Sequence, residues 1–177
     1  MSSPNNKDLS NFRIKWLNSK TSDAWLEQAI ANPIDLLIDH AHCERKAAGF
    51  ALQMMFRYLG DSLLAEVLSP LVREELEHFE RVLSVIKLRG RSLKVLPAPP
   101  YGGVLANHVR KEEPSRMLDS FLVAGLIEAR SHERMFLLAT HSPDNKLRDL
   151  YSYLLESEAR HFCLYWTLAE RRFSREV

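Results

Sequence analysis

Apolar residues recur at every third or fourth position along most of this chain, a spacing typical of amphipathic helices. The pattern predicts a short helix from about Ser22 to Ala31, followed by four long helices. The long helices are predicted to run from Asn32-Pro33 to about Tyr58, from Asp61 to about Arg89, from Ser115 to about Thr140, and from Ser142-Pro143 to about Phe173. The chain is therefore expected to be all-α.

Residues with strong preferences for helix ends mark these boundaries. Three polar residues are predicted to cap the N-termini of long helices: Asn32, Asp61 and Ser115. Gly60 and Gly90 are predicted to end the first and the second long helix. Pro70 lies inside the second helix and removes a backbone hydrogen bond, so a kink or break is expected near Ser69.

The predicted loops divide the four long helices into two pairs. Short turns join the first helix to the second and the third to the fourth, whereas 24 residues, Arg91 to Pro114, separate the second from the third. Two helical hairpins joined by one long crossover are the connectivity of a ferritin-like four-helix bundle. All 177 residues fit one such domain, with the short helix preceding the bundle. The crossover is rich in proline and glycine, and connections this long usually have a function.

The composition is ordinary for a globular protein, with 46% hydrophobic and 27% charged residues. Residues 1–15 lack the apolar core of a signal peptide, and the longest apolar run, residues 121–127, is far too short to cross a bilayer. Cys43 and Cys163 form no metal-binding or redox pair and are expected to be reduced thiols. These features predict a cytoplasmic protein that does not bind membranes.

Charge is distributed unevenly along the chain. Between Arg81 and Arg116, eight Lys or Arg accompany two glutamates, a net charge of +6, although the whole chain carries only +1. This basic stretch coincides with the crossover, and it either forms an ordinary solvated surface or attracts a polyanion such as RNA. Five of its residues are candidates for contact with phosphates: Arg89, Arg91, Lys94, Arg110 and Lys111.

Four glutamates interrupt the apolar faces of the long helices. At three, four and seven positions away, each has mainly apolar, small or histidine neighbours, and there is one on each long helix: Glu44, Glu75, Glu128 and Glu158. Glu77, by contrast, has charged neighbours at these spacings and is expected to face solvent. A buried ionised carboxylate costs several kcal/mol unless it is paired or binds a cation, so four together indicate bound metal.

Two histidines complete a ligand set. The motifs Glu75-x-x-His78 and Glu158-x-x-His161 each place a carboxylate and an imidazole on one helix face, and the second half of the chain repeats the first at an offset of 83 or 84 residues. One glutamate from each of two helices plus Glu-x-x-His from the other two is the ligand set of di-iron and di-manganese bundles. Iron or manganese suits these oxygen-rich donors better than zinc does. Glu75 and Glu158 are predicted to bridge the metals, and the other two glutamates to bind one metal each. A metal-free set of buried acids is the alternative.

Other polar residues lie near these motifs. His40 and His132 lie one turn from two of the glutamates, where they either donate hydrogen bonds to the ligands, act as extra ligands or simply pack in the core. Tyr165 is expected to be a core residue. Cys43 and Cys163 are predicted to be small buried residues.

Four segments carry a family resemblance: AHCERKAAGFALQ, REELEHFERVL, GLIEARSHERMFLL and ESEARHF. In this order and at these intervals they resemble the bacterial tRNA 2-methylthio-isopentenyladenosine hydroxylases, from about Trp25 to Phe173. The resemblance implies two iron ions (Fe2+/Fe3+) held by the six residues above, with O2 as co-substrate. It also implies hydroxylation of the isopentenyl group of a modified adenosine in the tRNA anticodon loop, with electrons from an unidentified reductase or ferredoxin.

Three other functions fit parts of the pattern. A quinone hydroxylase has a similar length and ligand set, but it works at a membrane and should carry an apolar docking surface rather than a basic crossover. A storage ferritin shares the bundle, whereas a rubrerythrin-like peroxide scavenger normally adds a four-cysteine unit that two distant cysteines cannot supply. A metal-free RNA-binding module is the remaining alternative.

Overall fold

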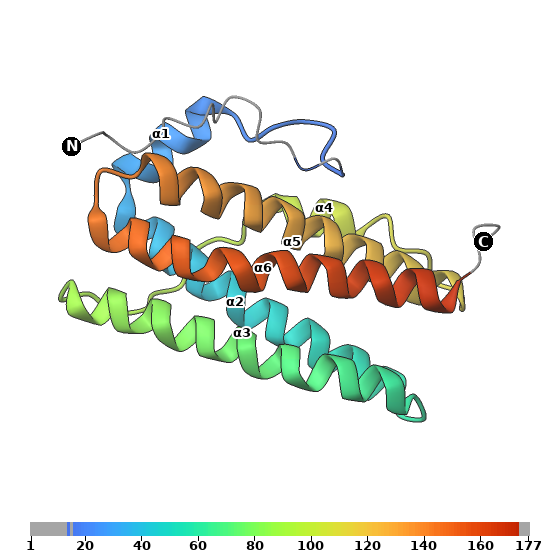
Figure 1. Ribbon diagram of the computed structural model, residues 1–177. Coiled ribbons are helices and arrows are strands. Elements are labelled where there is room, and N and C mark those ends of the chain that lie inside the picture. Colours follow the sequence, from blue (N-terminus) through green and yellow to red (C-terminus); the bar gives the residue numbers. More distant parts are fainter. Residues whose placement is uncertain (1–13, 15, 174–177) are drawn as a thin grey trace, which may run out of the picture.

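The four long helices pair into two antiparallel hairpins (Figure 1). The computed structural model describes residues 14 and 16–173, in which every regular element is a helix. The helices are α1 (Asp23–Ala31), α2 (Pro33–Arg57), α3 (Ser62–Leu88), α4 (Pro100–Ala106), α5 (Ser115–His141) and α6 (Asn145–Arg172). Helix α2 packs against α3, and α5 against α6, which confirms the predicted all-α, ferritin-like arrangement. Among the described residues, no helix is both long enough and apolar enough to cross a membrane.

Two apolar clusters fill the bundle, and all four long helices contribute to both. In α2, for example, Leu37 and Ala41 belong to the first cluster, and Ala51 and Met54 to the second. Glu44 lies between them along the helix and is only 4% exposed. The other long helices carry buried glutamates in the same interval, and α3 and α6 add a buried histidine each. The polar site therefore lies between two apolar blocks.

Aspartates cap two of the long helices. Asp61 caps α3 as predicted, because its carboxylate accepts a hydrogen bond from the backbone N–H of Leu64 at 2.9 Å. Helix α6 begins after Asp144, whose carboxylate accepts hydrogen bonds from the first turn, and not at Ser142-Pro143 as predicted. A carboxylate complements the positive end of the helix dipole better than a hydroxyl does, which explains the shift.

Of two other predicted caps, one is confirmed in position only and one is wrong. Asn32 is the residue before α2 and Pro33 begins the helix, as expected, but the side-chain amide of Asn32 donates to the carbonyl of Gln28 in α1, at 2.9 Å, and makes no capping hydrogen bond to α2. Ser115 is the first residue of α5 rather than the residue before it. The carboxylate of Glu113 instead accepts a hydrogen bond from the first turn of α5, at 3.3 Å.

Pro70 lies within α3, and the helix continues through it without the expected break. The proline itself is exposed, whereas Leu68 and Leu71 on either side are fully or almost fully buried. Burial of these leucines holds the backbone in place and offsets the lost hydrogen bond. Gly90, with φ of 66°, follows the end of α3 as predicted.

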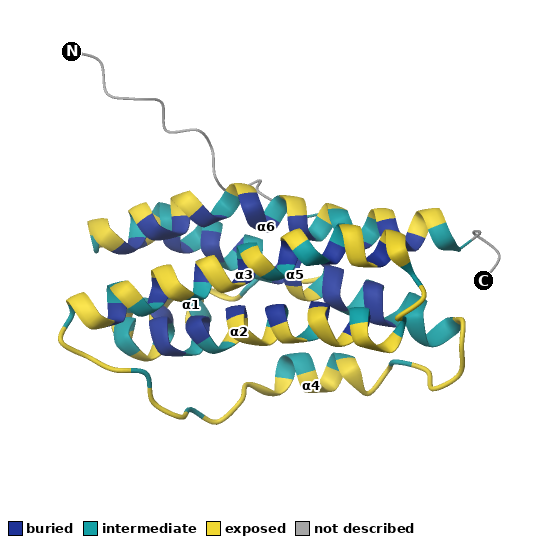
Figure 2. Ribbon diagram, turned by 90° about the horizontal axis from the view of Figure 1, so that it is seen from below, coloured by how far each residue is buried: buried dark blue, intermediate teal, exposed yellow. Residues whose placement is uncertain are grey.

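The crossover, residues 91–114, follows the side of the bundle formed by α2 and α5 (Figure 2). Its first part contacts α2, where the carbonyl of Lys94 lies 2.8 Å from Nε2 of His42. Its middle forms α4, which packs against α5 and was not predicted because two of its seven residues are glycines. Its last part reaches α5 through Arg110, which pairs with Asp119 at 2.8 Å.

Candidate metal centre

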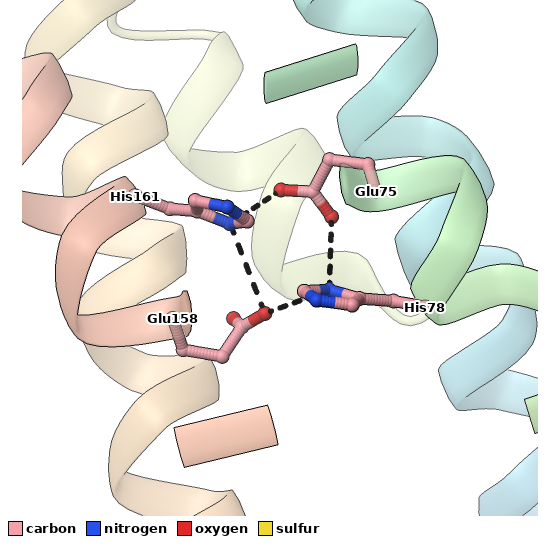
Figure 3. A group of neighbouring side chains, drawn as sticks. All are labelled: Glu75, His78, Glu158 and His161. Atoms are coloured by element: carbon pink, nitrogen blue, oxygen red, sulfur yellow. Dashed lines mark ion pairs between the residues drawn. The ribbon is translucent and has the colours of Figure 1, made fainter. Parts of the chain in front are cut away.

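The two Glu-x-x-His motifs face each other across the bundle (Figure 3). Glu75 and His78 project from α3, and Glu158 and His161 from α6. One nitrogen or oxygen atom from each of the four residues lies within 4.8 Å of the other three. None of the four is more than 4% exposed. A spacing of three residues places each pair on one helix face, so two facing helices bring all four together.

Nitrogen and oxygen atoms alternate around this cluster. His161 Nδ1 lies 2.8 Å from Glu75 Oε1 and 3.9 Å from Glu158 Oε1. His78 Nδ1 lies 3.5 Å from Glu158 Oε1 and 3.9 Å from Glu75 Oε2. Each imidazole therefore contacts the carboxylates of both motifs, and the two rings stack with their centroids 5.6 Å apart.

Glu44 and Glu128 bring the number of buried glutamates at the cluster to four. Glu44 Oε2 lies 3.5 Å from His78 Nδ1, and Glu128 interacts with Glu158. Both are at most 5% exposed, so the predicted burial of all four acids is confirmed. The six predicted ligand residues thus lie together, and their role as metal ligands stays a prediction.

The close packing of these acids changes how readily they ionise. Burial, and after it the neighbouring carboxylates, raise the pKa of Glu75 and of Glu128 well above the ordinary value. Glu44 differs, because the adjacent imidazoles of His40 and His78 outweigh burial and lower its pKa. Burial alone would also lower the pKa of His78, but the surrounding carboxylates raise it to about 9. Protons and divalent cations are alternative ways to neutralise this cluster, so metal binding must displace protons.

Four atoms at the centre of the cluster have no hydrogen-bond partner among the described residues: Glu75 Oε1, His78 Nδ1, Glu158 Oε1 and His161 Nδ1. These atoms lie near one another, but their geometry is not that of hydrogen bonds. Buried polar atoms are almost always satisfied, and a purely structural cluster would be expected to pair its own donors and acceptors. Carboxylate oxygens with imidazole nitrogens are donors that iron and manganese accept. The residues present therefore fit two divalent metals with one imidazole each.

Glu74 also contacts the centre, although the sequence did not single it out. Its Oε2 lies 3.0 Å from Nε2 of His161 and 3.2 Å from the guanidinium of Arg160. His161 thus directs Nδ1 toward the cluster and Nε2 toward Glu74. A carboxylate on the outer nitrogen fixes the tautomer and the orientation of a metal-binding histidine. The sequence signal was a second acid directly before Glu75.

The two further histidines have different surroundings. His40 is buried, shares a hydrogen bond between its Nε2 and Glu44, and stacks on Tyr151 with the ring centroids 5.4 Å apart. It therefore contacts a predicted ligand rather than only packing in the core. His132 is half-buried, and burial lowers its pKa, with Glu158 opposing that shift.

Tyr165 is a core residue as predicted, because it is 1% exposed and packs against Phe50 and Phe121. The predicted burial of Cys43 and Cys163 is wrong, since both are exposed and free. Each lies one or two positions from a buried residue that is a predicted metal ligand. One residue turns a helix by about 100°, so such neighbours point away from the core.

Nearly the whole chain resembles one family of enzymes. The family model described as tRNA-(MS[2]IO[6]A)-hydroxylase (MiaE) matches residues 9–177. This chain belongs to that family. It is therefore an enzyme of a tRNA hydroxylase family, and the resemblance read from the sequence is confirmed.

Two MiaE-family relatives carry the name tRNA 2-(methylsulfanyl)-N(6)-isopentenyladenosine(37) hydroxylase. The relative from Pseudomonas putida is 44% identical over 154 residues, which cover 87% of this chain and 75% of its own. The relative from Salmonella typhimurium is 28% identical, and the match covers 93% of this chain and 78% of that relative. A solved structure, "Protein 43 with aldehyde deformylating oxygenase activity from Synechococcus", superposes with a TM-score of 0.90 at 69% identity, covering 92% of this chain and 81% of that one.

The five basic residues predicted to contact phosphates are only partly available. Three form ion pairs with carboxylates: Arg89 with Asp144 at 2.5 Å, Lys94 with Asp35 at 2.8 Å, and Arg110 with Asp119 at 2.8 Å. Arg91 and Lys111 are exposed and pair with no carboxylate in the described part of the chain. Contact of these five residues with RNA stays a prediction.

Proposed function

We propose that this protein is an O2-dependent di-iron monooxygenase that hydroxylates the isopentenyl group of 2-methylthio-isopentenyladenosine in tRNA. Membership of the MiaE family supports the class of reaction. The observation that supports the metal-dependent mechanism is the set of four buried donor atoms in the two Glu-x-x-His motifs that lie close together without forming hydrogen bonds.

Six residues would hold the two iron ions: Glu44, Glu75, His78, Glu128, Glu158 and His161. Each iron would take one imidazole. Glu75 and Glu158 each contact both histidines, which supports their placement between the two metals. Glu44 lies beside His78 and would serve the metal on that side, which leaves Glu128 for the other. Iron that cycles between Fe2+ and Fe3+ would supply the activation of O2 that hydroxylation of an unactivated C–H bond requires.

The side chains of the protein prepare the centre for this chemistry. Four carboxylates balance the charge of two divalent ions. Their burial between two apolar clusters keeps bulk water away from the reacting atoms. Glu74 orients His161 and His40 holds Glu44, so ligands on both sides of the centre are supported from outside.

The proposed substrate is an adenosine in the tRNA anticodon loop, where an unpaired base can be inserted into a protein site. The basic crossover supports a polyanionic partner. Placing one atom of O2 in the substrate and reducing the other to water consumes electrons, so a reductase or ferredoxin is a required partner. We place the reaction in the cytoplasm.

Aldehyde deformylation is the second candidate function. Its support is the solved Synechococcus structure, whose title gives that activity at 69% identity to this chain. A buried oxygenase centre would suit either reaction. An aldehyde carries no charge and would gain nothing from the basic crossover, which favours the RNA substrate.

Nucleoside mass spectrometry of tRNA from a deletion strain tests the substrate. The hydroxylated nucleoside should disappear and its precursor should accumulate. The wild-type gene should restore the product, whereas a gene encoding Glu75→Ala should not. An undiminished level of the hydroxylated nucleoside in the deletion strain would defeat the substrate assignment and leave the metal centre intact.

The purified, iron-loaded protein separates the two candidates. Given O2 and a reductant, it should hydroxylate tRNA that carries the isopentenyl group and leave aldehydes of several chain lengths unchanged. Release of formate from an aldehyde, without hydroxylation of tRNA, would establish the second candidate instead.

A further inference from the structure

The two hairpins face each other along two pairs of helices, α3 with α6 and α2 with α5. We call the line between the two helices of each pair a seam, and the two seams differ in structure. At the α3–α6 seam the helices approach closely, and polar side chains cross between them. Arg160 reaches Glu74 at 3.2 Å, and the guanidinium of Arg81 lies 4.1 Å from the ring centre of Tyr153. At the α2–α5 seam the helices stay farther apart, since no Cα atom of α2 lies within 8 Å of one in α5.

The crossover, residues 91–114, covers the α2–α5 seam and is anchored on both of its helices. On the α2 side, the carbonyl of Lys94 lies 2.8 Å from His42. On the α5 side, a Cβ atom added to Gly102 in α4 would lie 3.9 Å from the side chain of Ile127. The stretch between these two contacts bridges the seam.

Both anchors lie beside the metal centre. His42 is two residues before Glu44, and Ile127 directly precedes Glu128. Figure 3 shows α4 behind the four labelled side chains, in the space between α2 and α5. Figures 1 and 2 show the crossover on the side of the bundle opposite α3 and α6, so it passes the centre on that side.

This part of the crossover is held loosely. No residue of α4 is buried, and residues 97–100 are all exposed. Val95 and Val104 are 94% and 55% exposed. A segment with few buried apolar contacts opens at a low free-energy cost. Opening this stretch would release only partly buried side chains, such as Leu93 and Leu96, and would leave the buried core of the bundle intact.

The charges of the two seams differ as well. Arg91 and Lys111, near the two ends of the crossover, are exposed and pair with no described carboxylate. Lys94 is paired, but more than half of its side chain is exposed.

At the α3–α6 seam, Arg160 pairs with Glu74 and Arg81 with Glu77. The crossover carries four Lys or Arg and two Glu, whereas α3 and α6 together carry eight Lys or Arg and nine Asp or Glu. The net positive charge of the crossover therefore attracts phosphates more than the α3–α6 seam does.

We propose that the crossover is the RNA-binding surface and that the modified adenosine enters the protein through the α2–α5 seam beneath it. This inference rests on the proposed function and names the side of the metal centre that tRNA approaches. Phosphates lie along the crossover from Arg91 to Lys111, the stretch between them moves aside, and the isopentenyl group reaches the centre between Glu44 and Glu128. The α3–α6 seam stays clear of RNA.

Two matched double variants test this surface. R91E with K111E reverses two charges on the crossover, and R73E with R171E makes the same change in net charge on α3 and α6. All four residues are exposed, and none pairs with a described carboxylate. Binding of an anticodon stem-loop RNA is measured by fluorescence anisotropy at several salt concentrations. The affinity of the crossover variant for the RNA should be lower by about tenfold or more, and its salt dependence should correspond to about one or two fewer phosphate contacts. The affinity of the control variant should stay within about twofold of wild type.

Hydrogen–deuterium exchange of the wild-type protein with the same RNA locates the contact independently. Residues 91–114 should become protected, and the exposed faces of α3 and α6 should not change. Equal weakening in both double variants, or protection of α3 and α6 in place of the crossover, would overturn the surface. If the protein hydroxylates tRNA but gives either of these contrary results, only the proposed RNA-binding surface is refuted. If the protein binds RNA through the crossover but does not hydroxylate it, only the proposed function is refuted.

Discussion

The Nε2 atom of His161 lies 3.0 Å from the carboxylate of Glu74, although the two residues are 87 positions apart and belong to different helices. His161 thereby uses both ring nitrogens, with Nδ1 facing the metal centre and Nε2 held from outside. Arg160 contacts the same carboxylate at 3.2 Å. The orientation of this histidine therefore depends on a neighbouring helix as well as on its own.

Replacing Glu74 should weaken metal binding without unfolding the protein. Glu74→Ala removes the group that orients His161 and should lower the affinity for iron(II) by about ten- to a hundredfold. Glu74→Gln keeps a hydrogen-bonding group without the charge, so its affinity for iron(II) should lie between those of wild type and Glu74→Ala. Competition with a chelator measures the affinity, and circular dichroism checks the fold. Glu77→Ala, at an exposed position of the same helix, is the control, and wild-type affinity in Glu74→Ala would remove this residue from the centre.

Losing a ligand should abolish metal loading altogether. Glu75→Ala and His161→Ala each delete a donor that faces the cluster, so elemental analysis should find far less than the roughly two metals per chain expected for wild type. Hydroxylation should be lost in parallel. Wild-type iron content in either variant would overturn the ligand set.

Removing the metal should destabilise the protein, and the loss should grow with pH. The pKa values of Glu75 and Glu128 are raised, and that of His78 is raised to about 9, so the folded metal-free protein holds protons that the unfolded chain releases. Stability from these protons is greatest in acid and disappears as pH rises through the folded pKa values. Glu44 has a lowered pKa and adds no slope above pH 6 because it is ionised in both states.

Thermal unfolding with and without a chelator measures this effect. Between about pH 6 and pH 9 the difference in Tm should widen, because cations replace the lost protons only in the loaded protein. A difference that stays constant, or narrows, across this range would contradict the coupling between protons and metal.

Asp61 links the start of α3 to the end of α6. Its carboxylate accepts hydrogen bonds from the backbone N–H of Leu64 at 2.9 Å and from Arg172 at 2.7 Å, and the bond from Arg172 is the main cause of its lowered pKa. Asp61→Asn keeps the cap but loses the charge, so it should cost about 1 kcal/mol of stability at pH 7.

The pH dependence of that cost identifies its origin. Because the pKa of Asp61 is lowered, its contribution is present above the ordinary pKa and is lost as pH falls through the folded value. Urea unfolding should therefore show the stability difference between wild type and Asp61→Asn shrinking as pH falls below the ordinary pKa of aspartate. Asp61→Ala also loses the cap and should remain less stable at every pH. A cost for Asp61→Asn that does not change with pH would rule out the ion pair as its source.

Much of the candidate metal centre could be predicted, because the spacing of apolar residues along a helix indicates which side chains face the core. Glu44 and Glu128 stand among apolar residues at three, four and seven positions, and this local pattern was enough to expect them in the core. The same logic placed Glu77 in solvent, where its side chain is 54% exposed. The approximate ends of the long helices and their pairing into hairpins were also predicted from residues close together in the sequence.

Features that depend on contacts between separate helices could not be predicted in this way. Glu74 contacts a histidine of α6, and spacing within α3 does not reveal that contact. Arg89 looked free in sequence but pairs with Asp144, 55 residues away. Pro70 was expected to kink or break α3, yet α3 continues through it unbroken because its neighbours pack against other helices. In each case the deciding partner lies far along the chain.

The two halves of the bundle repeat each other imperfectly. At the position equivalent to Glu74, the second half has Ser157, whose hydroxyl donates to the carbonyl of Leu154 at 2.8 Å. His161 therefore receives a carboxylate on its outer nitrogen, and the repeat supplies no such group for His78. A carboxylate on the outer nitrogen fixes the orientation of an imidazole ligand, so the two proposed metal positions are unequal. Iron should fill the position beside His161 first, and a form with a single ion should accumulate when metal is scarce.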